Sequence, residues 1–177
     1  MPPAAPWRFC PRCATGLEVR EIEQGRAPRL LCVECGFVAW QNPRVAAGAI
    51  FAHEGGIVLL RRSIAPSRGL WVFPGGFVDL GETTQEAAMR EALEEVRVRI
   101  GLTGILDAYS SHKSDVVSVV YAGHVLSGRP EVGDEALEVS SFPPESLPWD
   151  ELAFESTFSA LRDYVRRFYP RVRFPRS

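Results

Sequence analysis

Lysine and long apolar runs are both scarce in this sequence of 177 residues. No apolar stretch approaches the roughly 18 residues that a membrane-spanning helix needs, and the first residues lack the pattern of a signal peptide. Only Lys113 is a lysine among 20 basic residues, and the 22 acidic residues give a net charge of −2. Duplex-DNA-binding proteins rely on a basic surface, so this balance disfavours that class. We therefore expect a cytoplasmic protein with no membrane partner and no dedicated nucleic-acid partner.

Cysteine is absent beyond residue 35, and the four cysteines form two pairs, Cys10-x2-Cys13 and Cys32-x2-Cys35. Two such turns can supply the four thiolates of a tetrahedral, structural zinc site. Two disulfides or a redox-active CxxC motif are the alternatives. A reducing cytosol disfavours disulfides, and a redox motif does not need two matched pairs. The spacing predicts a small Zn²⁺-binding ribbon, which we place at residues 1–40.

The predicted ribbon is nearly balanced in charge, because residues 1–40 contain five arginines and four glutamates. A nucleic-acid-binding ribbon would need a basic patch. We therefore expect a structural or dimer-forming appendage, and a homodimer is a possible assembly.

The pattern changes after Gln41-Asn42-Pro43 to short apolar runs separated by turns. Glu54-Gly55-Gly56 predicts a hairpin turn between two of these runs, and Pro74-Gly75-Gly76 follows a third. The predicted elements are strands over 45–52, 57–60 and 70–73, and a closing helix over 158–173.

Residues 83–96 carry a strong helix signal. Thr83-x-x-Glu86 is a capping-box pattern, in which both side chains satisfy free amides of the first turn. The spacing predicts a helix from Thr84 to Val96. At about 100° per residue, one side, which we expect to pack on the sheet, carries four apolar residues, Met89, Ala92, Leu93 and Val96.

The opposite side of this helix carries three carboxylates, Glu91, Glu94 and Glu95. A solvated helix face is one interpretation. However, Glu91 and Glu95 are a like-charge i,i+4 pair, which destabilises an isolated helix. Crowded carboxylates beside a Gly-Gly turn favour Mg²⁺ or Mn²⁺ bound together with substrate phosphates. The spacing alone leaves both interpretations open.

The stretch from Gly76 to Val98 resembles the Nudix box, G-x5-E-x7-R-E-U-x-E-E-x-G-U, where U is a bulky aliphatic residue or alanine. Here Gly76 is followed by five residues, Glu82, seven residues and Arg90-Glu91-Ala92-Leu93-Glu94-Glu95-Val96-Arg97-Val98. Every charged position matches without a gap. One position differs, since Arg97 stands where the box has its final glycine.

The resemblance extends to the lead-in Gly69-Leu70-Trp71 and Phe73-Pro74-Gly75-Gly76. With the cysteine pairs, it is similar to the Nudix subgroup that has an N-terminal zinc ribbon, which includes NADH pyrophosphatases and plant ADP-ribose/FAD pyrophosphatases. The resemblance implies an α/β (α+β) fold: a Nudix α/β/α sandwich with a mixed sheet over residues 41–177, preceded by the ribbon.

The family also implies roles for the matching residues. Arg90 would orient a box carboxylate by a charge-assisted hydrogen bond, and Glu82 would support the loop or a second metal. The ligands of a divalent cation, Mg²⁺ or Mn²⁺, would be Glu91, Glu94, Glu95 and the carbonyl of Gly75 or Gly76.

The general base has two family precedents. One is the residue matching Glu91, and the other is a carboxylate on a loop after the box, for which Glu135 and Glu138 are the best matches. Being three residues apart, one of these two can point into the site while the other points outward. A solvated acidic loop is the alternative for each.

Arg97 raises a separate question. A glycine at this position allows the left-handed conformation that ends a helix, which costs an arginine roughly 1 kcal/mol. Alternatively, the helix continues, or the chain enters a strand at 98–100 directly and leaves Gly101 as the flexible point.

The resemblance implies hydrolysis of the diphosphate linkage in a nucleoside diphosphate derivative, with a small-molecule nucleotide as substrate. A dinucleotide-like substrate of the ADP-ribose, FAD or NADH type, releasing AMP, is favoured. Nucleoside triphosphates, oxidised or not, and a non-catalytic ligand-binding or nucleic-acid-binding module are the alternatives. Trp71, His112 and Lys113 are weak candidates for substrate contact. A core position is the favoured alternative for Trp71, whereas a phosphate contact and an ordinary loop are equally supported for His112 and Lys113.

Overall fold

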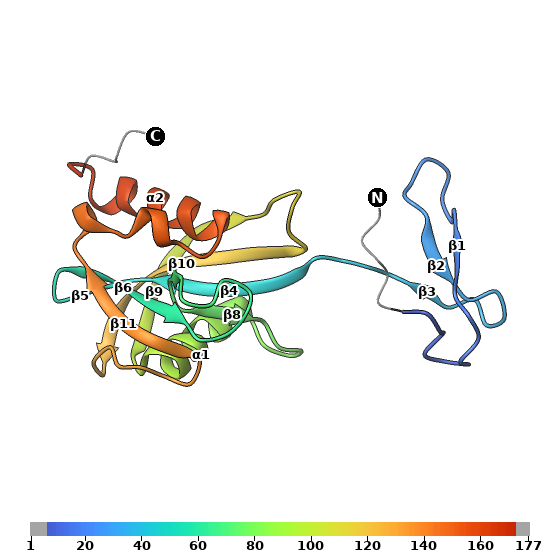
Figure 1. Cartoon of the computed structure of the whole chain (residues 1–177), viewed down its shortest axis with the longest axis horizontal. Helices are drawn as coiled ribbons and strands as arrows, with labels where there is room; N and C mark the ends of the chain where they lie inside the picture. Colours follow the sequence, from blue (N-terminus) through green and yellow to red (C-terminus); the bar gives the residue numbers. More distant parts are fainter. Residues whose placement is uncertain (1–6, 173–177) are drawn as a thin grey trace. The chain divides into compact units, whose positions relative to one another are not determined.

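The computed structural model describes residues 7–172. The chain divides into two units, with the boundary between Asn42 and Pro43 (Figure 1). Within residues 7–172, no helix is both long enough and apolar enough to cross a membrane.

The first unit is a three-stranded antiparallel sheet in the order β1-β2-β3. Its strands are short: β1 spans Glu18–Arg20, β2 spans Arg29–Leu31 and β3 spans Val38–Ala39. Each cysteine pair lies in a turn closed by a backbone hydrogen bond to the carbonyl of its first cysteine. The donors are the amides of Ala14 (2.9 Å) and Gly36 (2.9 Å), and both residues have positive φ angles.

The second unit contains two sheets, and the first of them includes a parallel pair of strands. The first sheet has the order β8-β4-β10-β9, and β4 and β10 are parallel; its strands are β4 (Arg44–Ile50), β8 (Gly75–Phe77), β9 (Arg99–Tyr109) and β10 (Val116–Ser127). The second has the order β11-β6-β5, with β7 also paired to β6; its strands are β5 (Ala52–His53), β6 (Gly56–Arg62), β7 (Trp71–Val72) and β11 (Ala136–Phe142).

One helix covers each side of these strands, α1 (Thr84–Val96) and α2 (Glu155–Phe168) (Figure 1). The alternation of strand residues explains this arrangement. On β6, Val58 and Leu60 are buried with the α1 residues, whereas Ile57 and Leu59 are buried with α2. Two apolar clusters therefore hold a mixed sheet between helices, and the predicted α/β/α sandwich is confirmed.

The predicted hairpin between 45–52 and 57–60 is wrong over most of its length. Only β5 and the start of β6 pair in this way, with Ala52 opposite Ile57. Strand β4 instead pairs with β8 and β10. The chain passes from the first sheet to the second at Phe51, which is fully buried, so the two long strands belong to different sheets.

Helix α1 has the predicted bounds and capping box, since Thr83 accepts from the Glu86 amide and Glu86 accepts from the Thr83 amide. The predicted packing face is right for Ala92 and Val96, which are fully buried, and wrong for Met89 and Leu93. Met89 and Leu93 are each 37% exposed, and the fully buried alanines of α1 are Ala87, Ala88 and Ala92. These small residues let the helix approach the strands closely, and Glu95 is buried with them.

The predicted closing helix corresponds to α2, which begins and ends earlier than expected. Its buried side, which includes Leu161 and Val165, packs in the second apolar cluster. The last residue of the predicted span, Arg173, lies outside the described residues.

Candidate active site and cysteine cluster

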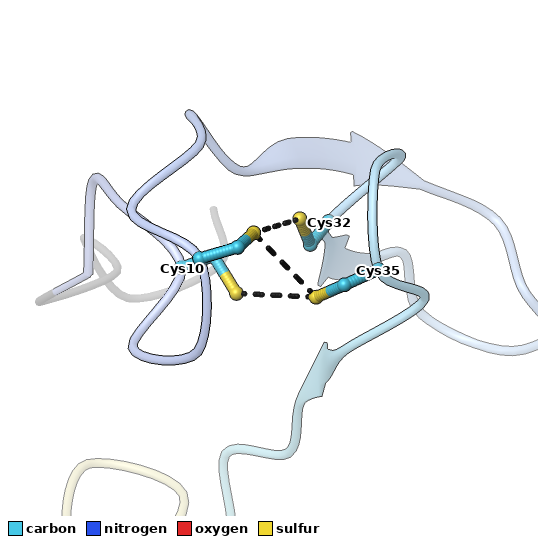
Figure 2. Close-up of side chains that lie close together, drawn as sticks. Cys10, Cys32 and Cys35 are labelled. Carbon is cyan, nitrogen blue, oxygen red and sulfur yellow. Dashed lines mark hydrogen bonds between the residues drawn. The ribbon is translucent and has the colours of Figure 1, made fainter.

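The four cysteines form a compact group. Their sulfur atoms all lie within 4.8 Å of one another, and no other set of three or more His, Cys, Asp or Glu residues within 7–172 is as close. The Sγ atoms are 3.6 Å apart for Cys10 and Cys35 and 3.4 Å apart for Cys13 and Cys32 (Figure 2). Tetrahedral zinc with Zn–S bonds of about 2.3 Å needs sulfur atoms about 3.8 Å apart, so the cluster fits zinc.

The thiols also compete for ionisation. Hydrogen bonds to the side chain and backbone of Thr15 lower the pKa of Cys13 to about 6. The Phe37 amide lowers the pKa of Cys35, but desolvation and the neighbouring thiols outweigh it and raise that pKa to about 12. A bound cation would favour the thiolate form of all four cysteines.

The second group of potential ligands is built by α1 and the β8 strand. The amide of Gly75 donates to Glu95 Oε2 at 2.8 Å. At Gly76, a Cβ atom would lie only 2.3 Å from Glu91 Oε1, so a larger residue would displace that carboxylate. The two glycines therefore let the backbone of β8 contact the carboxylate side of the helix.

Arg90 connects the other acidic residues of the box. Its Nε and Nη2 atoms donate to the two carboxylate oxygens of Glu82 at 2.8 and 3.0 Å. Nη1 donates to Glu91 at 2.7 Å and to Glu94 at 3.0 Å, and Nη2 also donates to the Phe77 carbonyl. The hydrogen bonds from Arg90 lower the pKa of Glu82, and those carboxylates raise the pKa of Arg90. Arg90 thus holds three box carboxylates in one network.

Glu95 lies outside this network and is buried. Glu95 is 6% exposed, and within residues 7–172 its carboxylate accepts one hydrogen bond, from the Gly75 amide. Desolvation raises the pKa of Glu95 to about 8 and also raises the pKa of Glu91. Repulsion from Glu94 further raises the pKa of Glu91, and repulsion from Glu91 further raises the pKa of Glu95. Carboxylate oxygens are the ligands that a hard divalent cation prefers, and the nearest candidates for this role are Glu91 and Glu95.

The two post-box carboxylates are oriented differently. Glu135 directly follows Gly133 and Asp134, whose amides donate to the Glu95 and Glu94 carbonyls of α1, and its negative charge raises the pKa of both Glu91 and Glu95. Glu138 instead lies opposite Arg61 in the β11–β6 pair, with its Oε2 atom 3.2 Å from Arg61 Nε. The structure therefore brings Glu135, rather than Glu138, toward the box carboxylates.

The weaker candidates lie elsewhere. Trp71 is 3% exposed and packs edge-on against Phe142, with ring centroids 4.9 Å apart. This is the core position that was its favoured alternative. His112 and Lys113 lie on the loop between β9 and β10, where Lys113 pairs with Glu155 of α2 at 3.2 Å.

Arg62 is a further residue near the site that was not among the predicted ones. Its positive charge lowers the pKa of Glu95, and its guanidinium lies over the Phe154 ring, 5.1 Å from the centroid. The signal in the sequence was the pair of arginines that ends strand β6 just before the lead-in to the box.

Arg97 adopts the left-handed conformation, with φ 59° and ψ 25°, and its amide donates to the carbonyls of Ala92 and Leu93. The helix therefore ends as it would with the glycine of the box. The Arg97 side chain forms an ion pair with Asp134 that sequence analysis did not anticipate.

Family models cover nearly all of the described chain. The NUDIX domain model matches residues 42–164, and the Nudix N-terminal model of the zinc ribbon matches residues 8–41. An ADP-ribose pyrophosphatase of Methanocaldococcus jannaschii is 36% identical over 129 residues, which are 71% of this chain and 75% of the relative.

Two further relatives differ in how much they share. A NUDIX hydrolase of Nitrosomonas europaea has a crystal structure that matches with a TM-score of 0.86 and 31% identity, over 94% of each chain. The NAD-capped RNA hydrolase NudC of Chromobacterium violaceum is 38% identical over 94 residues, 52% of this chain but 33% of that protein. From the box geometry and the two family matches, the chain belongs to the Nudix family and is a Nudix pyrophosphohydrolase with an N-terminal zinc-ribbon segment.

Proposed function

We propose that this enzyme hydrolyses the diphosphate linkage of a dinucleotide-like substrate of the ADP-ribose, FAD or NADH type and releases AMP. The observation that carries the proposal is the buried carboxylate side of α1, where Glu91 and Glu95 face the Gly75-Gly76 strand. The names of the relatives support the substrate class, since one is an ADP-ribose pyrophosphatase and another acts on NAD-capped RNA.

The residues that would hold a catalytic divalent cation, Mg²⁺ or Mn²⁺, are Glu91, Glu94, Glu95 and the Gly75 carbonyl. When bound, the cation would neutralise charge on the diphosphate and lower the pKa of a water molecule. Arg90 keeps Glu91 and Glu94 in place through its hydrogen bonds and itself rests on Glu82. Gly76 keeps open the space that the Glu91 carboxylate occupies.

The chemical step adds water to one phosphorus atom and breaks its bond to the bridging oxygen, which leaves with the second phosphate. The proton of the water needs an acceptor near the box. Glu135 suits this role because it directly follows the segment that bonds to the Glu94 and Glu95 carbonyls and is itself exposed. Catalysis then consists mainly of positioning and charge neutralisation.

The ribbon has a different role in this proposal. All four ligands of its zinc ion are protein thiolates, so no coordination position remains for a substrate, and the ion is structural. The four cysteines form no disulfide, which supports a location in the reducing cytoplasm.

Turnover of a substrate panel tests the proposal. The panel contains ADP-ribose, FAD, NADH and 8-oxo-dGTP, each with Mg²⁺ or Mn²⁺ and with chelator, and AMP and pyrophosphate are quantified. We expect cation-dependent release of AMP from at least one of the first three. Preferential release of pyrophosphate from 8-oxo-dGTP would replace this substrate class with nucleoside triphosphates, in line with a relative named putative 8-oxo-dGTP diphosphatase.

A further inference from the structure

The residue that departs from the box pattern contacts the loop after the box. Arg97 Nη2 pairs with Asp134 Oδ1, and both side chains are exposed. A glycine at position 97 would end the helix in the same conformation but would have no side chain to make this contact. The ion pair is therefore specific to a chain with arginine here.

The segment around Asp134 packs against the C-terminal end of α1. Three backbone hydrogen bonds join them: the amides of Glu131, Gly133 and Asp134 donate to the carbonyls of Val96 (3.1 Å), Glu95 (3.0 Å) and Glu94 (3.3 Å). These carbonyls would otherwise lack partners at the helix end. The segment thus caps the same helix that carries the box carboxylates.

Gly133 fits this contact because it has no side chain. A Cβ atom on Gly133 would lie 2.0 Å from the Glu94 carbonyl oxygen and 2.5 Å from that of Glu95. Both atoms belong to the helix backbone, which cannot move aside cheaply. A larger residue at 133 would therefore force the segment away from α1.

Glu135 comes immediately after this contact and is also fixed on its other side. Its carbonyl accepts from the Ser63 amide at 3.0 Å, and the next residue, Ala136, is buried and pairs with Arg62 of β6. The position of Glu135 is thus set by α1 before it and by β6 after it. The two residues before it, Gly133 and Asp134, bond to the backbone of Glu95 and Glu94, so Glu135 begins next to the helix turn that carries these carboxylates.

We propose that Arg97, Gly133 and Asp134 form a latch that positions Glu135 beside the box carboxylates. This inference rests on the proposed function, in which Glu135 accepts the proton from water. The latch residues are positioning residues, because none of them contacts the reacting atoms. Arg97 therefore substitutes for the box glycine in ending the helix and adds a contact that orders the loop of the base.

The expected effects follow from the contacts. Exposed ion pairs contribute little, so the Asp134→Asn and Arg97→Gly variants should each lower kcat about threefold to fivefold. Gly133→Ala displaces the backbone, and we expect its kcat to fall more than tenfold. KM should change less than twofold in all three variants, because Glu135 acts on the water and not in substrate binding. Arg97→Lys should recover at least half of the kcat lost in Arg97→Gly.

The experiment measures kcat and KM of these variants alone and in a Glu135→Gln background. Asp115→Asn is the matched control, because Asp115 forms an ion pair with Arg44 and is as exposed as Asp134, each with 72% of its side chain accessible. We expect Glu135→Gln to lower kcat strongly, Asp134→Asn to cause no further loss in that background, and Asp115→Asn to match wild type. Thermal melting of each variant reports whether it folds.

Three results would overturn the latch: a wild-type kcat in Glu135→Gln, an undiminished effect of Asp134→Asn in the Glu135→Gln background, or equal effects of Asp134→Asn and Asp115→Asn. Including Glu95→Gln in the same assay separates this failure from that of the proposed function. If Glu95→Gln is inactive while the latch variants match wild type, only the latch is wrong. If Glu95→Gln keeps full activity, the proposed function itself fails.

Discussion

The cysteine cluster and the box carboxylates both offer metal ligands, yet they are built in opposite ways. The cysteines come from two separate turns, and their sulfur atoms face one another. The carboxylates come from one helix and are spaced by Arg90, which already pairs with Glu91 and Glu94. A closed group of thiolates suits an ion that stays in place, whereas spaced carboxylates can admit a cation together with substrate.

The surroundings of the two groups differ as well. Within residues 7–42, only Cys10, Cys32 and Ala39 are buried. The second unit has two extensive apolar clusters, one on each side of its strands. We therefore expect the ribbon to depend on a bound ion for folding, and the hydrolase unit to fold on its own core and to need a cation only for chemistry.

Loss of a zinc ligand should have the largest effect on stability. Structural zinc contributes roughly 10–16 kcal/mol in small zinc-binding peptides, so Cys32→Ser should unfold the ribbon. We expect one zinc per wild-type chain, none in the variant, and loss of dispersed amide resonances from residues 7–42 only. Glu34→Gln is the control, because Glu34 lies in the same turn but is not a ligand, and it should keep its zinc. A folded ribbon without zinc would contradict the comparison.

A cavity in the core should affect the other unit alone. Leu60 is fully buried on the α1 side of β6, and Leu60→Ala should lower the free energy of unfolding by about 2–5 kcal/mol. Denaturant unfolding measures this loss, and the zinc content should not change. Leu137→Ala, at an exposed leucine of β11, should change stability by no more than about 0.5 kcal/mol. Release of zinc from Leu60→Ala would show that the two units do not fold independently.

The helix cap should have a smaller effect. Thr83→Ala removes the side-chain partner of the Glu86 amide and should lower stability by about 1 kcal/mol, whereas Thr83→Ser should retain most of it. The difference in melting temperature between the two variants checks this estimate. Equal melting temperatures would mean that solvent replaces the cap at no cost.

Much of the arrangement followed from the sequence because local chemistry determines it. The cysteine spacing, the capping box and the bounds of α1 all depend on residues within one or two turns of each other. The pairing of β4 was not predictable in this way, because a Gly-Gly turn signals a reversal of the chain but not which strands become neighbours. Whether the strands form one sheet or two depends on contacts between residues that are far apart in the sequence.

The orientation of α1 shows a second limit. Hydropathy correctly placed Ala92 and Val96 in the core, but it also placed Met89 and Leu93 there, and Ala87 and Ala88 pack in their stead. Small side chains on this face allow close contact with Gly75 and Gly76, and that contact carries Glu91 and Glu95 inward. The carboxylate of Glu95 is therefore buried while the larger apolar side chains of Met89 and Leu93 are exposed. A hydropathy pattern cannot predict such an exchange.

The difference between a catalytic cation site and a solvated helix face is tested most directly at Glu95. Glu95→Gln keeps the shape of the side chain but removes a ligand, so kcat/KM should fall by roughly 10²–10⁴, or about 3–5 kcal/mol of transition-state stabilisation. Without divalent cations, the variant should melt at the same temperature as wild type or higher, because repulsion with Glu91 is relieved. With millimolar Mg²⁺, wild type should gain more stability than the variant, because only its intact site binds the cation well. Retained turnover in Glu95→Gln, together with equal stabilisation of both proteins by Mg²⁺, would contradict the assignment of the box carboxylates as the catalytic site.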